Sequence, residues 1–242
     1  MLQLSVTWLI VVVFGLSTLV RATLGFGEAL IAVPVLAFVL PVEVAAPIAM
    51  LISITVAAIV VAQDWRHVHF RAAGRLVLAS LFGIPLGLLL LREVPEPIVK
   101  GVLGAVVAVF SASFFVRDLP VLDDDRLAWV FGLGAGILGG AYGLNGPPLV
   151  VYGTLRRWPP DRFRATLQGY FLPASLMGMT GYAAAGLWTP TVSAYYLRCL
   201  PVVLVAIAIG GWLSRRVTPG RFLVYVHAAL IVIGAALLMQ AI

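Results

Sequence analysis

The chain has 242 residues, of which 62% are hydrophobic and 11% are charged, and its mean hydropathy is +1.08. A soluble domain does not need so much apolar surface, and several stretches approach the roughly 20 apolar residues that cross a bilayer. The composition therefore predicts an all-α integral membrane protein with several spans. The formal net charge of +6 fits arginines in short loops better than a nucleic-acid partner, and no nucleic-acid-binding module is visible.

The first predicted element, Gln3–Leu40, is apolar but interrupted near its middle. The stretch "LVRATLGFGEALIAVP", Leu19–Pro34, contains an arginine, a glutamate and two glycines. A charge at bilayer depth costs at least roughly 2.5–3.5 kcal/mol on insertion scales, so it usually faces a cavity, a partner or a substrate. We predict a re-entrant-like hairpin of two short helices from about Leu9 to Ala37, broken at "RATLGFGE".

Three segments that can each cross the bilayer once follow the first hairpin: 42–62, 76–91 and 97–116. The loop "QDWRHVHFRAAGR", residues 63–75, carries three arginines, and basic loops stay on the cytoplasmic side. Its two histidines, His67 and His69, are not enough to predict a metal site. The first half of the chain, 1–117, is followed by an acidic linker, 118–126, which we expect to be cytoplasmic.

A second broken hairpin is predicted at Leu127–Leu155, which must begin and end on the cytoplasmic side. Two full crossings would need about 40 residues at ~20 each, but this element has only 29. Two short helices separated by a break at "GGAYGLNGPP" can begin and end on the same side within this length. Segments 165–180, 194–213 and 222–241 can then each cross once, which completes a second half, 127–242.

The two halves resemble each other, and their loops indicate opposite orientations. A shift of 118 residues places Gly25 on Gly143 and Pro41 on Pro159. The loops 63–75, 117–126, 155–164 and 214–221 hold 12 of the 16 basic residues, whereas 181–193, the counterpart of 63–75, has no charge. Equivalent loops therefore lie on opposite sides. We predict two inverted-topology repeats, each with one broken hairpin and three transmembrane spans.

The two breaks have the chemistry of an anion-binding site. A helix that begins inside the membrane has unpaired N–H groups and roughly half a positive charge at its first turn. Helices beginning near Gly27–Glu28 and Gly146–Pro148 could direct these donors at one anion. Arg21 would add a full positive charge and a fork suited to an oxyanion.

Each polar candidate also has a structural interpretation. Arg21 could form an ion pair with Glu28 or extend to the interface, and Glu28 could pair with Arg21, carry a proton or favour the helix dipole. Asn145 and Gln168 could orient substrate oxygens or join helices. Tyr142 and Tyr152 could line the cavity or simply pack. These alternatives stay open at the level of sequence.

The motifs also resemble a known family. The stretches "LGFGEALIAVPVL", "GLGAGILGGAYGLNGPPLVVY" and "FRATLQGYF" are similar to those of the sulfite exporter TauE/SafE family over nearly the whole chain. The first motif departs from the common pattern, because Glu28 and Ala29 stand where further glycines often follow. The resemblance implies a multi-pass protein of a bacterial-type inner membrane that transports small, often sulfur-containing anions, with export as the expected direction.

Residues and resemblance together predict a secondary transporter that works by alternating access. An anion channel or a non-transporting assembly or sensor subunit is the alternative. No nucleophile elbow or Walker motif is present, so we expect neither an enzyme nor a cofactor or metal. The expected partners are a small anion, membrane lipid and a coupling proton or sodium ion, and the sequence does not fix the oligomeric state. The predicted substrate-binding residues are Arg21, Gly25, Gly27, Glu28, Tyr142, Gly143, Asn145, Gly146, Pro147 and Gln168.

Overall fold

A computed structural model describes residues 2–115, 121–214, 216 and 220–240. Within these residues every regular element is a helix. The predicted linker positions 118–120 and the last predicted positions of the spans 97–116 and 222–241 lie outside them. The elements are α1 (Leu2–Leu24), α2 (Glu28–Leu36), α3 (Val42–Asp64), the 3₁₀ helix η1 (Trp65–His67), α4 (Phe70–Glu93), α5 (Glu96–Ser113), α6 (Ala128–Tyr142), α7 (Gly146–Leu155), α8 (Pro160–Ala184), α9 (Pro190–Leu213) and α10 (Gly220–Gln240).

Among the described residues, five helical segments are long and apolar enough to cross a membrane. They are Val6–Leu24, Val42–His67, Phe70–Glu93, Glu96–Ser113 and Pro190–Leu213. Helix α8, which contains the predicted span 165–180, has 25 residues but falls outside this set, since glutamine, serine, threonine and tyrosine dilute its apolar residues. The chain is therefore an all-helical, multi-pass membrane protein by length and composition.

The first hairpin differs from the prediction in the length of its first arm. Helix α1 has 23 residues and could cross the membrane alone, so the prediction of two short helices was wrong here. The reason is that a single glycine, Gly15, is the only helix breaker before Gly25, and one glycine costs a helix only about 1 kcal/mol. The second hairpin does consist of two short helices, α6 with 15 residues and α7 with 10.

Both breaks lie at the predicted motifs and depend on glycine. Gly25 and Gly27 have φ angles of 91° and 109°, and Gly143 has a φ of 65°. Side chains with a Cβ rarely adopt these left-handed conformations, whereas glycine does so freely. The chain can therefore leave α1, reverse within three residues and begin α2 at Glu28.

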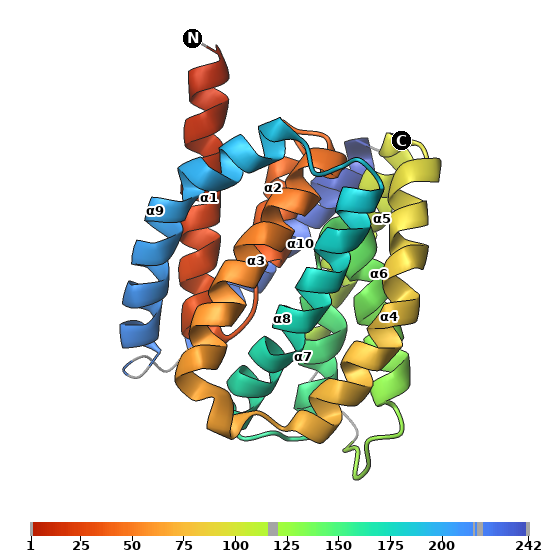
Figure 1. Cartoon of the computed structure of the whole chain (residues 1–242), viewed down its shortest axis with the longest axis vertical. Coiled ribbons are helices and arrows are strands. Elements are labelled where there is room, and N and C mark those ends of the chain that lie inside the picture. Colours follow the sequence, from red (N-terminus) through yellow and green to blue (C-terminus); the bar gives the residue numbers. More distant parts are fainter. Residues whose placement is uncertain (1, 116–120, 215, 217–219, 241–242) are drawn as a thin grey trace.

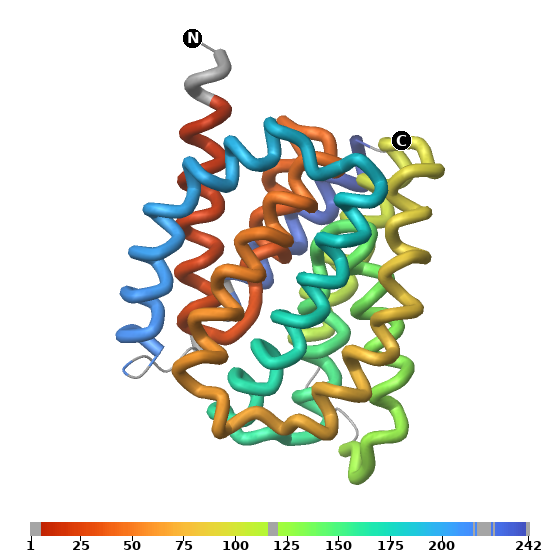
Figure 2. The backbone as a smooth tube through the Cα atoms, in the orientation of Figure 1, coloured from red at the N-terminus to blue at the C-terminus, as the bar shows by residue number. Residues whose placement is uncertain are grey.

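The helices pack as a bundle in which the principal pairs are α1 with α9, α3 with α8, α4 with α6, and α5 with α10. In Figure 1, α3 and α8 run through the middle of the bundle. The α3–α4 connection, residues 121–127, the α7–α8 connection and the end of α9 lie at one end, the lower end in Figures 1 and 2. The N-terminus and the α2–α3, α4–α5 and α8–α9 connections lie at the opposite, upper end.

Helices α4 and α6 approach each other along a seam of glycines. On α6 the seam uses every fourth residue, beginning at Gly132, and a Cβ added at Gly136 would lie 2.7 Å from both Cα and O of Ser80 on α4. The Ser80 hydroxyl donates to the Gly132 carbonyl across the same seam, at 2.7 Å. Small residues that let two backbones approach closely are a main source of helix association in membranes.

We expect Gly136→Leu to destabilise the protein, because the added side chain would meet the α4 backbone, which cannot move aside. Overpacking of this kind costs about 3 kcal/mol, on the order of 10 °C in apparent Tm for a chain of this size. Gly134→Leu is the matched control, since Gly134 lies on the same helix and a Cβ there meets only Pro148, at 3.8 Å. Thermal unfolding in detergent compares them. Equal Tm values would contradict the seam.

Candidate functional site

The two breaks meet at a small cavity inside the bundle. Its volume is about 20 Å³, which is room for about one water molecule. The first turn of α2, the second break, α3 and α8 all contribute to its wall. The lining residues are Arg21, Phe26, Gly27, Glu28, Ala29, Leu30, Ser53, Gly143, Leu144, Asn145, Gly146, Pro147 and Phe171.

Arg21 is the most highly connected side chain of this cavity, and only 3% of the residue is exposed. Its Nη1 donates to Glu28 Oε2 at 2.7 Å and to Ser53 Oγ at 2.9 Å, and its Nη2 donates to Gln168 Oε1 at 2.9 Å. The Phe171 ring lies 4.7 Å from the guanidinium carbon, within the range of a cation–π contact. Of the two structural interpretations of Arg21, the ion pair with Glu28 is therefore the one present. The side chain does not extend to the membrane interface.

Three buried polar atoms at the cavity have no hydrogen-bond partner among the described residues. They are Arg21 Nε, Glu28 Oε1 and Asn145 Oδ1, and all three residues line the cavity. A buried polar group without a partner costs about 1–3 kcal/mol, so such groups are usually satisfied by water or a ligand. Arg21 Nε and Glu28 Oε1 thus belong to lining residues and have no partner in the part of the chain that the structure describes, whereas Asn145 Oδ1 packs against Gly139.

The helix N-termini at the cavity differ in the donors they can supply. The first hydrogen bond within α2 runs from Ile31 N to Gly27 O, at 3.0 Å, so the N–H groups at 27–30 have no acceptor within the helix. Helix α7 begins "GPP", and its two prolines have no N–H to offer. Most main-chain donors for an anion would therefore come from α2.

The structure brings most of the predicted site residues together at the cavity. Gln168 does not line the cavity but contacts residues at the site. Its Nε2 donates to the Gly25 carbonyl at 2.7 Å, and its Oε1 accepts from Arg21. Tyr142 turns away, and its hydroxyl donates to the Val99 carbonyl on α5 at 3.0 Å. The predicted residues that line the cavity are Arg21, Gly27, Glu28, Gly143, Asn145, Gly146 and Pro147.

Sequence reasoning missed four residues that surround Arg21. Ser53 on α3 accepts from Arg21 and shares a 2.9 Å hydrogen bond with Ser175 on α8. Both serines interrupt apolar spans, and this was a usable signal for buried polar residues. Phe26 and Phe171 carried no such signal, because aromatic residues occur throughout a membrane protein.

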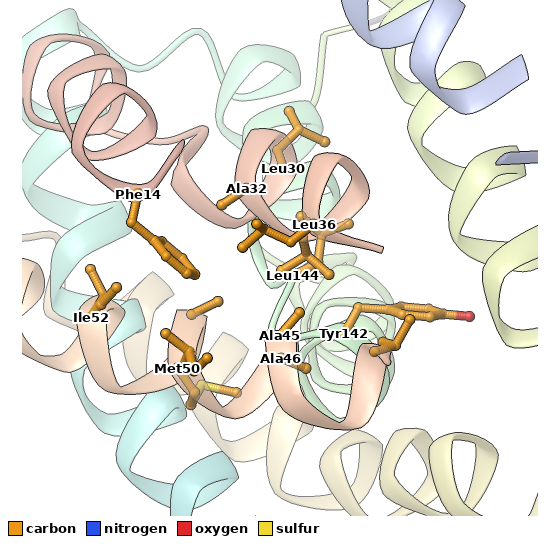
Figure 3. Close-up of a cluster of buried hydrophobic side chains, with 14 of the residues drawn as sticks. Phe14, Leu30, Ala32, Leu36, Ala45, Ala46, Met50, Ile52, Tyr142 and Leu144 are labelled. Atoms are coloured by element: carbon orange, nitrogen blue, oxygen red, sulfur yellow. The ribbon is translucent and has the colours of Figure 1, made fainter. Parts of the chain in front are cut away.

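Different side chains bound the cavity toward the upper and the lower end of the bundle. Toward the upper end it is covered by a cluster of buried side chains from α1, α2, α3 and the second break, of which Figure 3 shows Phe14, Leu30, Leu36, Met50 and Leu144 among others. Toward the lower end, Phe26 lines both the cavity and a much larger hollow. Phe26 is therefore part of the wall of both the cavity and that hollow.

The end of the acidic linker holds the lower end of the second hairpin. The carboxylate of Asp125 lies 3.2 Å from Arg156 and 3.7 Å from Arg75, and it accepts from the Tyr152 hydroxyl at 2.8 Å. The main chain adds a hydrogen bond from Leu122 N to the last residue of α7, at 2.9 Å. Tyr152 thus ties α7 to the linker and does not line the cavity.

Comparisons with known proteins identify a family and a relative. Residues 9–237 match the sequence model of the family described as "Sulfite exporter TauE/SafE". The chain is similar to a protein of Cupriavidus necator named "Probable sulfite/organosulfonate exporter TauE", with 25% identity over 235 residues, 94% of this chain and 92% of the relative. No solved structure matches the chain.

Proposed function

Because the chain belongs to the sulfite exporter TauE/SafE family, whose members are transporters and not enzymes, we propose that it is a secondary transporter that exports small sulfur-containing anions such as sulfite or organosulfonates. The membrane would be a bacterial-type inner membrane. The observation that carries this proposal is the buried Arg21, which lies at a small cavity with the N-terminus of α2.

Glu28 occupies the place on Arg21 that a substrate anion would take. Its carboxylate is bound to Nη1 at 2.7 Å, and a sulfonate or sulfite group would present similar oxygens to the same fork. A substrate bound beside an ionised Glu28 would bring a second negative charge into a buried site, which is costly. In the proposed mechanism the substrate therefore displaces Glu28, and a proton neutralises the displaced carboxylate.

This exchange explains why a proton is the proposed coupling ion. Arg21 with ionised Glu28 has no net charge, and Arg21 with a monovalent substrate and protonated Glu28 has none either. Both states avoid an uncompensated charge in a medium of low dielectric constant. Proton binding and substrate binding are thus favourable together, so proton and anion would cross the membrane in the same direction, outward in export.

The helix contacts support the proposed inverted repeats. In an inverted repeat, α1 to α5 correspond to α6 to α10 in order. The counterpart of the α1–α9 contact is then the α6–α4 contact. The counterpart of the α4–α8 contact is the α9–α3 contact. Both members of each pair are present, and α3–α8 and α5–α10 are their own counterparts. Transporters built from inverted repeats usually work by alternating access, in which one repeat moves against the other.

We expect Arg21→Gln to weaken substrate affinity ten-fold or more, because hydrogen bonds to a charged group contribute about 1.5–3 kcal/mol. Glu28→Gln should retain binding and lose the dependence of transport on a pH gradient, because the competing carboxylate is gone. Methanesulfonate uptake into proteoliposomes measures both, since this anion keeps its charge across the neutral pH range.

The matched control for this flux experiment is Arg198→Gln. Arg198 is exposed and donates to Thr7 at 3.3 Å, far from the cavity, so its loss should leave uptake unchanged. Wild-type affinity in Arg21→Gln would refute the site. Flux that dissipates a methanesulfonate gradient but never accumulates the anion would favour a channel, and no flux at all would favour a non-transporting subunit.

The proposed orientation places the lower end of the bundle in the cytoplasm, because the arginine-bearing loops belong to that end. In a Cys199→Ser background, we expect His67→Cys and Asp161→Cys to react with an impermeant thiol reagent from the cytoplasmic side. Ala184→Cys should react from the opposite side. All three positions are exposed, whereas Cys199 is buried. Labelling of positions 67 and 184 from the same side would exclude the inverted arrangement.

A further inference from the structure

A second hollow, with a volume of about 730 Å³, opens below the central cavity. We call it the lower vestibule. It lies among the end of α1, the end of α5, α7, the start of α8 and α10. Its described lining residues are Thr23, Leu24, Phe26, Phe110, Ser113, Phe114, Val150, Val151, Thr154, Arg157, Trp158, Pro160, Asp161, Phe163, Arg164, Ser214 and His227.

The lower vestibule differs in size from the central cavity it adjoins. The central cavity has room for about one water molecule in this conformation, whereas the vestibule is within the ~300–1,000 Å³ range of pockets that hold small organic ligands. Phe26 lines both hollows, and its ring lies edge-on to Phe163 with 6.3 Å between the ring centroids. A ligand in the vestibule would therefore lie next to the central site but outside it.

The charged side chains of the vestibule favour an anion. Two arginines and one aspartate, Arg157, Arg164 and Asp161, contribute a net positive charge from the described lining. Arg164 donates to Ser214 Oγ at 2.5 Å. The Arg157 side chain is exposed and is held by no hydrogen bond or ion pair within the described residues, so its guanidinium is available to a ligand.

The backbone at Arg157 is unusual for an arginine. Helix α7 ends in a Schellman motif, in which Arg157 N donates to Thr154 O and Trp158 N donates to Gly153 O. The residue at this point must be left-handed, and Arg157 has a φ of 48°, the one positive value of a non-glycine residue in the described chain. Helix α8 ends with the same motif and has Gly186 there. At the end of α7 this position is occupied by Arg157, whose side chain lines the vestibule. Glycine would adopt the same backbone conformation with less strain.

Aromatic rings form another part of the wall, beside His227 on α10. Only 2% of His227 is exposed, and its ring stacks on Phe114 with the centroids 4.2 Å apart and the planes at 13°. Phe110 lies edge-on to it at 5.6 Å. The His227 Nδ1 has no hydrogen-bond partner among the described residues. His227 therefore forms an aromatic wall of the vestibule together with Phe110 and Phe114.

We propose that the lower vestibule is a separate binding site for organic anions that combine a sulfonate head with an aromatic or long alkyl body. Arg157 and Arg164 bind the head, and Phe110, Phe114 and Phe163 contact the body. This inference rests on the proposed function, because the vestibule would hold a substrate before Phe26 moves to admit its head to Arg21. Anions without a body, such as sulfite, gain only the electrostatic part of this binding.

The test measures the binding of 4-fluorobenzenesulfonate and methanesulfonate to purified protein, by ¹⁹F line broadening and by calorimetry. Arg157→Gln should weaken the aromatic sulfonate five-fold or more, because it removes the head contact. Phe114→Ala should weaken the aromatic sulfonate by a similar factor and leave methanesulfonate unchanged, because only the body contact is lost. Arg162→Gln is the matched control, since Arg162 is exposed and is absent from the lining.

Arg21→Gln separates this inference from the proposed function. Its binding of 4-fluorobenzenesulfonate should stay within two-fold of wild type, whether or not its transport is lost. If Arg21→Gln abolishes the binding of the aromatic sulfonate, there is one site and the vestibule is only a passage. Wild-type affinity in both Arg157→Gln and Phe114→Ala would also overturn the inference.

An anionic lipid offers the same combination of charged head and apolar body. The titration is therefore repeated in phosphatidylcholine nanodiscs with and without phosphatidylglycerol. Equal affinities in the two membranes would support a soluble organic anion as the occupant. A marked loss of affinity in the presence of phosphatidylglycerol, abolished in Arg157→Gln, would show that lipid occupies the vestibule and would overturn the assignment.

Discussion

The buried ion pair of Arg21 with Glu28 sets the geometry of this protein. The two residues are seven positions apart, yet their side chains meet at 2.7 Å and both are buried. Their meeting requires the chain to reverse between α1 and α2 inside the bundle, and Gly25 and Gly27 supply the left-handed backbone for that reversal. The same reversal turns the N-terminus of α2 toward the cavity. Charge neutralisation, the helix break and the exposed N–H donors therefore follow from a single local arrangement.

The second break lies at the equivalent place but differs in backbone and chemistry, because only Gly143 is left-handed there. With the shift of 118 residues, Gly139 corresponds to Arg21 and Gly146 to Glu28, so the second half has no charge at either position. Instead the Asn145 side chain packs against Gly139, where a Cβ would collide with it. In the proposed inverted repeat, the first half would supply the charge that binds the anion and a titratable group, and the second half would supply an amide and a glycine-rich surface. This division would let one site respond to both anion and proton.

Much of this site could be predicted from the sequence because its signals are costly exceptions to an apolar background. Arg21 and Glu28 in a membrane helix, and the glycines beside them, have few explanations other than a buried site. The length of α1 was mispredicted because the repeat suggested equal hairpins, whereas helix length follows local propensity. Ser53 could be predicted only as a buried polar residue, and Phe26 not at all, because their contacts come from the packing of α3 and α8 around the first break. Side-chain contacts between distant segments are not visible in periodicity.

The most direct test of the central claim is to locate the anion itself. Anomalous diffraction at the selenium edge, from crystals of the Cys199→Ser protein soaked with selenite as a sulfite analogue, would distinguish the ligand from water. We predict a selenium peak within hydrogen-bonding distance of the Arg21 guanidinium, between the N-termini of α2 and α7, with the Glu28 carboxylate moved off Arg21. A selenium peak elsewhere with the Arg21–Glu28 pair intact would contradict the account.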